Sequence, residues 1–239
     1  MAKERLKVIQ AGNLWMAVQY TAIRGPDPGQ RREAKAMIST PARESLNAKL
    51  SWQRLMLLLA ANFSSRDLVV TLTYRDEQLP RHREDAMKRI QYFVRLLRAE
   101  RKARGQPFRY VYTTEGYHSK GRLHHHLIVN AVGGDYQMIR DLWKRNGDNV
   151  DYESFGWDGA ERWGKYLTKE PREQGRRHVG DRTWSASRNL VRAKPHTEFV
   201  PAGEALMPPA GAKIVDRAQC DNCYGRFCYI MAYLPEETN

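Results

Sequence analysis

Two histidines in the stretch Gly121–Asn130 have the spacing of metal ligands on a β-strand. Alternate side chains of a strand share a face, so His124 and His126 point one way while His125 points to the apolar side. Both imidazoles can then bind one cation, and Glu115, just before a glycine-bounded turn, offers a carboxylate beside them. This ligand set leaves room for water and phosphate oxygen, and it predicts a Mn²⁺ or Mg²⁺ site.

A second candidate group lies in the segment Trp163–Glu170, where Tyr166 and Lys169 are three residues apart. On a helix these two side chains share a face. A tyrosine acts as a nucleophile by losing its phenol proton, and a neighbouring ammonium can stabilise charge that builds up on a phosphate. Alone this spacing is a weak signal, because Tyr166 also fits a half-buried core position. A strand pair of histidines is likewise more often structural, but an acid and a tyrosine nearby favour a reactive site.

The composition favours a polyanionic partner. Lys and Arg number 40 against 27 Asp and Glu, which gives a net charge of +13. Bases that neutralise phosphates release counterions, so such a charge suits nucleic acid, although a basic ribosome-associated or merely soluble protein has the same composition. No apolar run approaches the roughly 18 residues of a spanning helix, and the first residues lack the apolar core of a secretory signal. We therefore expect no membrane partner and a cytoplasmic location, which the late, sparse cysteines also favour.

Hydrophobic periodicity predicts the elements that position these residues. Helices are predicted at residues 41–63, 84–104, 135–145 and 158–169, and strands at 67–74, 109–114, 122–129, 149–154 and 227–234. This order predicts an α+β fold with a ferredoxin-like, or RRM-like, antiparallel sheet and helices on one face. We expect three parts: an N-terminal helical extension (1–64), a central domain (65–195), and a linker with a C-terminal segment (196–239).

Three segments resemble, in order and spacing, the motifs of the HUH endonucleases. Val69–Tyr74 is similar to their structural first motif, and Glu115 with His124–His126 is similar to their metal motif. Tyr166–Lys169 is similar to their Tyr-x-x-Lys nucleophile motif. Further along, Trp184–Leu190 resembles a segment that follows the nucleophile in phage and plasmid replication initiators.

The resemblance covers about residues 66–170 and implies a rolling-circle replication initiator with the HUH endonuclease fold. Tyr166 would attack a phosphodiester of single-stranded or hairpin origin DNA, keep the 5′ phosphate as a phosphotyrosine, and release a 3′-OH for synthesis. Lys169 would assist, a divalent metal would polarise the phosphate, and reversal would rejoin the ends. The family's middle position is usually hydrophobic but is His125 here, which leaves open which histidines bind metal; strand alternation favours 124 and 126.

Two other functions fit the same residues. A single-tyrosine HUH transposase uses the same chemistry, and a non-catalytic nucleic-acid-binding module would use the histidines only for contact. The tyrosine follows the histidines, unlike in conjugative relaxases, and the N-terminal extension and basic tail favour an initiator over a compact transposase. Gly116–Leu123 has the glycine spacing of a phosphate loop without its Lys-Ser/Thr end. We therefore expect a separate helicase as partner, and homo-oligomerisation stays open.

Five arginines and one tryptophan are predicted to contact DNA. They are Arg75, Arg122, Arg176, Arg177 and Arg188, with Trp184 available to stack on an unpaired base. For each residue of the basic run a solvated charged loop is an equally good interpretation. Cys220, Cys223 and Cys228 have half the pattern of a structural zinc site, but ordinary thiols are the favoured interpretation.

Overall fold

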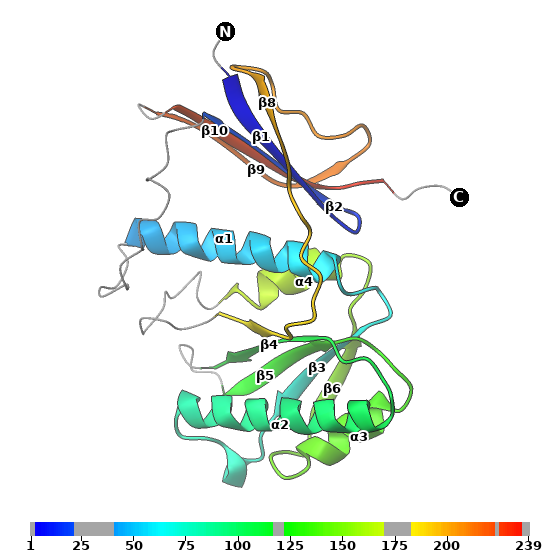
Figure 1. The fold of residues 1–239 in the computed structure, drawn as a ribbon. Helices are drawn as coiled ribbons and strands as arrows, with labels where there is room; N and C mark the ends of the chain where they lie inside the picture. Colours follow the sequence, from blue (N-terminus) through cyan, green and yellow to red (C-terminus); the bar gives the residue numbers. More distant parts are fainter. Residues whose placement is uncertain (1–2, 22–40, 117–121, 170–182, 223–224, 236–239) are drawn as a thin grey trace, which may run out of the picture. The chain divides into compact units, whose positions relative to one another are not determined.

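The computed structural model describes five stretches of the 239-residue chain: 3–21, 41–116, 122–169, 183–222 and 225–235 (Figure 1). Two compact units divide the chain, one made of residues 1–36 and 191–239 and the other of residues 37–190. Each unit contains one five-stranded antiparallel sheet. Among the described helices, none combines the length and the apolar composition that crossing a bilayer requires.

The unit of residues 37–190 has the predicted α+β architecture, with strand order β6-β3-β5-β4-β7. The strands are β3 (Leu68–Thr73), β4 (Tyr110–Glu115), β5 (His124–Val129), β6 (Val150–Ser154) and β7 (Ser185–Ala186). The helices are α1 (Pro41–Ala60), α2 (Arg83–Ala103), α3 (Asp135–Trp143) and α4 (Gly159–Tyr166), with a short 3-10 turn at Asp76–Gln78. All four predicted helices and the predicted strands of this unit are confirmed to within a few residues.

Helices cover both faces of this sheet, whereas the sequence predicted helices on one face. One hydrophobic cluster joins α2 and α3 to inward residues such as Val70 and Leu127. A second cluster joins α1 and α4 to the opposite residues, among them Val69 and Ile128. The reason is visible in the central strands: their nearly continuous apolar runs require burial on both sides. The α1 segment, predicted as part of a separate extension, therefore belongs to this unit.

The other unit corrects the predicted ends of the chain. Its strands are β1 (Lys3–Ala11), β2 (Leu14–Thr21), β8 (His196–Pro201), β9 (Lys213–Asn222) and β10 (Gly225–Tyr233), in the order β8-β1-β2-β10-β9. The predicted helical extension thus begins with a β-hairpin, whose turn contains Gly12 at φ 56°. Residues 196–239 are mainly strands rather than a linker, and only β10 was predicted among them. Polar and apolar residues alternate in β1, the two-residue period of a strand.

A buried ion pair ties α2 to the start of α3. The fully buried Arg101 donates to Asp135 Oδ1 at 2.5 Å, and its guanidinium also donates to the carbonyls of Pro107 and Asn130 at 3.1 and 3.0 Å. The second oxygen of Asp135 accepts the Val132 N–H at 2.6 Å. Removing the carboxylate would leave a buried guanidinium without its counter-charge.

We therefore expect Asp135→Ala to lower the free energy of unfolding by about 3–5 kcal/mol, measured by urea titration with circular dichroism. The control is Glu100→Ala, which removes the partner of an exposed pair with Arg104 (3.7 Å) and should cost less than about 1 kcal/mol. Equal, small losses in both variants would contradict a structural role for the buried pair.

Candidate metal centre

The β4–β5 hairpin places the predicted ligands together. Glu115 pairs directly with His124 across the two antiparallel strands, and Thr113 pairs with His126. Paired residues share a face, so the carboxylate and both imidazoles lie on the side of the sheet that carries α1 and α4. At the end of β4, Gly116 has φ 92°, and a Cβ there would collide with the Arg122 backbone. The close return of the chain thus requires glycine.

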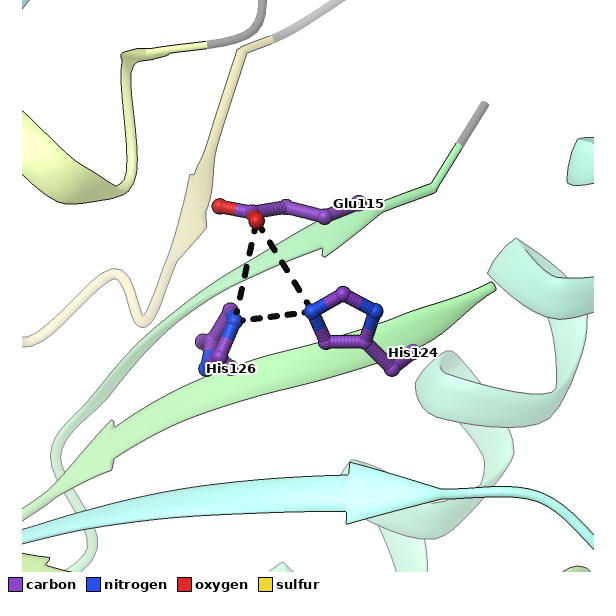
Figure 2. A group of neighbouring side chains, drawn as sticks. All are labelled: Glu115, His124 and His126. Atoms are coloured by element: carbon purple, nitrogen blue, oxygen red, sulfur yellow. Dashed lines mark hydrogen bonds and ion pairs between the residues drawn. The ribbon is translucent and has the colours of Figure 1, made fainter. Parts of the chain in front are cut away.

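Figure 2 shows the Glu115 carboxylate facing the two imidazoles. Glu115 Oε2 lies 3.7 Å from Nε2 of His124 and 3.7 Å from Nε2 of His126. The two Nε2 atoms are 3.0 Å apart, and one ligand atom from each residue lies within 4.8 Å of the others. In the described part of the chain this is the one cluster of at least three acidic, histidine or cysteine side chains with such spacing.

Second contacts orient both imidazoles toward the cluster. Nδ1 of His124 lies 2.8 Å from the Arg122 carbonyl, which can only accept, so Nδ1 carries the proton and Nε2 keeps its lone pair. Nδ1 of His126 lies 3.1 Å from Thr71 Oγ1 on β3. Burial lowers the pKa of His124, against the effect of the Arg122 carbonyl, and this favours the neutral, ligating form.

The donor set fits a divalent cation. Burial would raise the pKa of the Glu115 carboxyl, but the neighbouring His126 and Lys169 outweigh it, so the pKa is lowered and the carboxylate stays ionised. Glu115 Oε1 is buried and has no hydrogen-bond partner among the described residues. An ionised carboxylate and two imidazole nitrogens are ligands of Mn²⁺ in proteins, whereas a site of oxygen ligands alone is more typical of Mg²⁺.

The predicted nucleophile lies beside this cluster, at the end of α4. The ring of Tyr166 meets the His126 ring edge-on, with centroids 4.9 Å apart. Lys169 Nζ lies 3.7 Å from the centre of the Tyr166 ring and 3.2 Å from Glu115 Oε2. Burial would lower the pKa of Lys169, but contact with the Tyr166 hydroxyl and the Glu115 carboxylate raises it, so the ammonium is retained. The geometry brings all five predicted metal and catalytic residues together.

The packing of α4 on α1 sets the position of Tyr166. Gly164 approaches Met56 so closely that a Cβ on this glycine would lie 2.6 Å from Met56 Cγ. Trp163 and Leu167, which flank the site residue, are buried in the cluster that α1 and α4 share. The tyrosine therefore rests on a helix whose own anchors are apolar.

His125 points into the opposite core, as strand alternation predicts. It is fully buried, with Nε2 2.6 Å from the Tyr74 hydroxyl and Nδ1 2.8 Å from Thr114 Oγ1. Burial, reinforced by nearby cations and the adjacent histidines, holds its pKa well below the usual range. The side chain is neutral and hydrogen-bonded at both nitrogens, so it replaces a hydrophobic residue without being a metal ligand.

Sequence reasoning missed the residues that hold the histidines in place. Thr71, which contacts His126, lies on β3 and reaches its partner only through the β3–β5 register. Tyr74 and Thr114 hold His125 in the same indirect way. The available signal was a polar Thr71 on the inward-facing side of an otherwise apolar strand.

The predicted DNA contacts lie in different surroundings. Arg122 pairs with Asp76 and donates to the Tyr74 carbonyl at 2.7 Å, immediately before the metal cluster. Arg75 pairs with Asp148 at 3.4 Å and is partly exposed. Arg176 and Arg177 lie outside the described residues. The contacts of these arginines with DNA stay predictions.

Trp184 and Arg188 follow the site in the chain but differ in exposure. Trp184 packs against the cluster of α1 and α4, and its Nε1 donates to Ser51 Oγ at 3.2 Å. A ring held in this way has less surface free for stacking on a base than the sequence suggested. Arg188 is exposed and lines a surface hollow with Arg98 and Lys102.

The cysteines do not form the zinc site that was considered. Cys220 pairs with Phe227 and Gln219 pairs with Cys228, so the side chains of Cys220 and Cys228 point to opposite faces of the sheet. Cys223 lies outside the described residues. Cys220 is exposed and Cys228 is buried, both as free thiols.

A family model of replication-associated proteins of the ORF2 type matches residues 67–178. The match spans somewhat less than half of the chain and includes Glu115, His124, His126, Tyr166 and Lys169. It is consistent with a Rep-type replication initiator. Comparisons with curated proteins and with solved structures give no significant match.

The two histidine assignments predict different metal binding. We expect His124→Ala to weaken Mn²⁺ binding at least about tenfold in calorimetry, because one of three ligands is lost. His125→Leu is the matched control, which should retain Mn²⁺ affinity while losing roughly 1–3 kcal/mol of stability through the buried Tyr74 hydroxyl. The reverse pattern, with affinity lost only in His125→Leu, would show that the wrong pair was chosen.

Proposed function

We propose that this protein is a rolling-circle replication initiator that nicks single-stranded origin DNA with Tyr166. One observation carries the proposal: Tyr166 and Lys169 lie against a buried Glu115–His124–His126 cluster, within the segment that resembles replication-associated proteins. Neither the tyrosine nor the metal cluster alone would indicate this chemistry. Their contact joins a nucleophile to a site for phosphate oxygen.

The reaction is a transfer of the DNA strand to the protein. The Tyr166 oxygen forms a bond to phosphorus, and the bond from phosphorus to the 3′ oxygen breaks. The phenol proton passes to solvent and the departing oxygen takes one up, which leaves a 5′-phosphotyrosine and a free 3′-OH. When bound, a divalent cation supplies Lewis acidity toward a phosphate oxygen. The reverse transfer rejoins the ends without a further energy source.

Lys169 is suited to compensate negative charge at the reacting atoms. Its ammonium, retained through contact with Tyr166 and Glu115, stabilises a deprotonating phenol and charge on the phosphate. Its ion pair with Glu115 also connects the nucleophile to the ligand cluster at 3.2 Å. Arg122, next to the ligands, and Arg75 are proposed to meet the DNA backbone. Strand separation is assigned to a separate helicase.

Adduct formation tests the nucleophile. The protein is incubated with Mn²⁺ and a labelled library of single-stranded and hairpin oligonucleotides, and covalent complexes are separated on a denaturing gel. We expect Tyr166→Phe to abolish the adduct, while Tyr92→Phe, which alters a partly exposed tyrosine on α2, retains it. An adduct of equal yield in Tyr166→Phe would refute the assignment, and no adduct on any DNA would favour a non-catalytic binding module. Short terminal palindromes around the gene would favour a transposase.

Lys169→Met should slow adduct formation by roughly 100-fold while leaving Mn²⁺ affinity within a few-fold of wild type, because charge stabilisation is lost but the ligands remain. Lys165→Met provides the matched control on the same helix, since Lys165 pairs with Glu161 rather than with the site. Single-turnover gels measure both rates. Equal rates in the two variants would exclude a role for Lys169 in the transfer.

A further inference from the structure

One row of residues across the β8-β1-β2-β10 part of the second sheet is rich in aromatic rings. Phe199 of β8 lies opposite Arg5 of β1, which lies opposite Tyr20 of β2. Tyr20 in turn lies opposite Phe227 of β10. Paired residues of antiparallel strands share a face, so the four side chains form one row of roughly 14 Å at about 4.8 Å per strand. We call the face that carries this row the aromatic face.

The rings at the two ends of the row are open to solvent. Phe199 is 59% exposed and Phe227 is 44% exposed. The Arg5 guanidinium lies over the Phe199 ring at 5.3 Å, and Tyr20 is half-buried between the strands. Single exposed rings are ordinary, but two on one row with a cation between them indicate a surface that binds something.

The aromatic face also carries the bases of β1. Residues alternate between faces along the strand, so Lys3 and Lys7 lie on the same face as Arg5, while Glu4 lies on the other. Glu4 faces Arg226 there at 3.7 Å. Within the described residues, none of the three bases of the aromatic face forms an ion pair with an acid. Their charge is available to a polyanion.

The acid that this face does carry is remote and engaged. Among the described strand residues it is Asp216, which pairs with Met231, two rows from Phe227. The Tyr229 hydroxyl donates a hydrogen bond to its carboxylate. The row of rings is therefore bordered by positive charge at the end where it is exposed.

We propose that the aromatic face binds single-stranded DNA, with bases stacked on Phe199, Tyr20 and Phe227 and phosphates near Lys3, Arg5 and Lys7. Stacking rings combined with cations are the means by which proteins hold unpaired strands, because every base has a face that can stack. A duplex hides those faces. The surface lies outside residues 67–178 and away from the metal ligands in sequence. Identifying the nucleic acid as DNA rests on the proposed function.

The binding test uses the full chain carrying Tyr166→Phe, in EDTA, so that neither nicking nor metal contributes. Anisotropy of fluorescein-labelled oligothymidylate gives Kd. Combining Phe199→Ala with Phe227→Ala should raise Kd by about 10- to 100-fold, the loss of one or two stacked bases. Arg5→Ala should lower the slope of log Kd against log salt by about 0.7. An unlabelled duplex of the same length should compete poorly.

Two matched controls separate this face from general effects. Tyr92→Ala removes a ring of similar exposure on α2, and Arg217→Ala removes an exposed base on the opposite face of the same sheet. Both should leave Kd unchanged, and circular dichroism checks the fold of every variant. A wild-type Kd in the double phenylalanine variant overturns the proposal. So does a change in its sedimentation coefficient alone, which would make the face a self-association surface.

Photocross-linking gives a second measurement that needs no variant of the face. Oligonucleotides with 5-bromodeoxyuridine should cross-link to peptides of β2, β8 or β10, whereas cross-links confined to residues 37–190 overturn the proposal. The adduct assay is scored separately. Loss of the adduct with a retained Phe199 and Phe227 dependence refutes the nickase and leaves the aromatic face supported; the reverse result refutes the aromatic face alone.

Discussion

The register between β4 and β5 is the constraint on which the candidate site depends. It sets Glu115 opposite His124, and through the two-residue period of the strand it also brings His126 to the same carboxylate. A slip of one residue would turn His124 and His126 into the core of α2 and α3, and would turn His125 outward. Both faces of the sheet are buried, so such a slip would expose apolar side chains along the whole strand.

The two faces of β5 have divided the work of a triple histidine. On one face, two imidazoles carry lone pairs toward an ionised carboxylate, and α4 adds Tyr166 and Lys169. On the other, His125 is a neutral core residue whose hydrogen bonds to Tyr74 and Thr114 satisfy both nitrogens. A buried polar ring is tolerated because no donor or acceptor of that ring is left unpaired. The chemistry of one face thus rests on the packing of the other.

The second unit is built from both ends of the chain. The β1–β2 hairpin pairs with β8 on one side and with β10 on the other, so residues near position 5 and near position 227 occupy one row. The family model covers neither end. An arrangement with one reactive unit and one sheet of exposed rings would let a replication protein hold an unpaired strand at two places. Affinity would then be divided between a specific reaction site and a sequence-tolerant surface.

Local patterns in the sequence were sufficient for the elements of residues 41–169 and for the site. Alternation separated His124 and His126 from His125, helical spacing joined Tyr166 to Lys169, and the glycine turn placed Glu115, because each signal acts over a few residues. Only the tertiary structure decided that helices cover both faces, that Trp184 packs inward, and that Cys220 and Cys228 face apart. It also decided that the two ends of the chain share a sheet. Pairing between strands about 200 residues apart depends on long-range burial and register, which no short stretch of sequence contains.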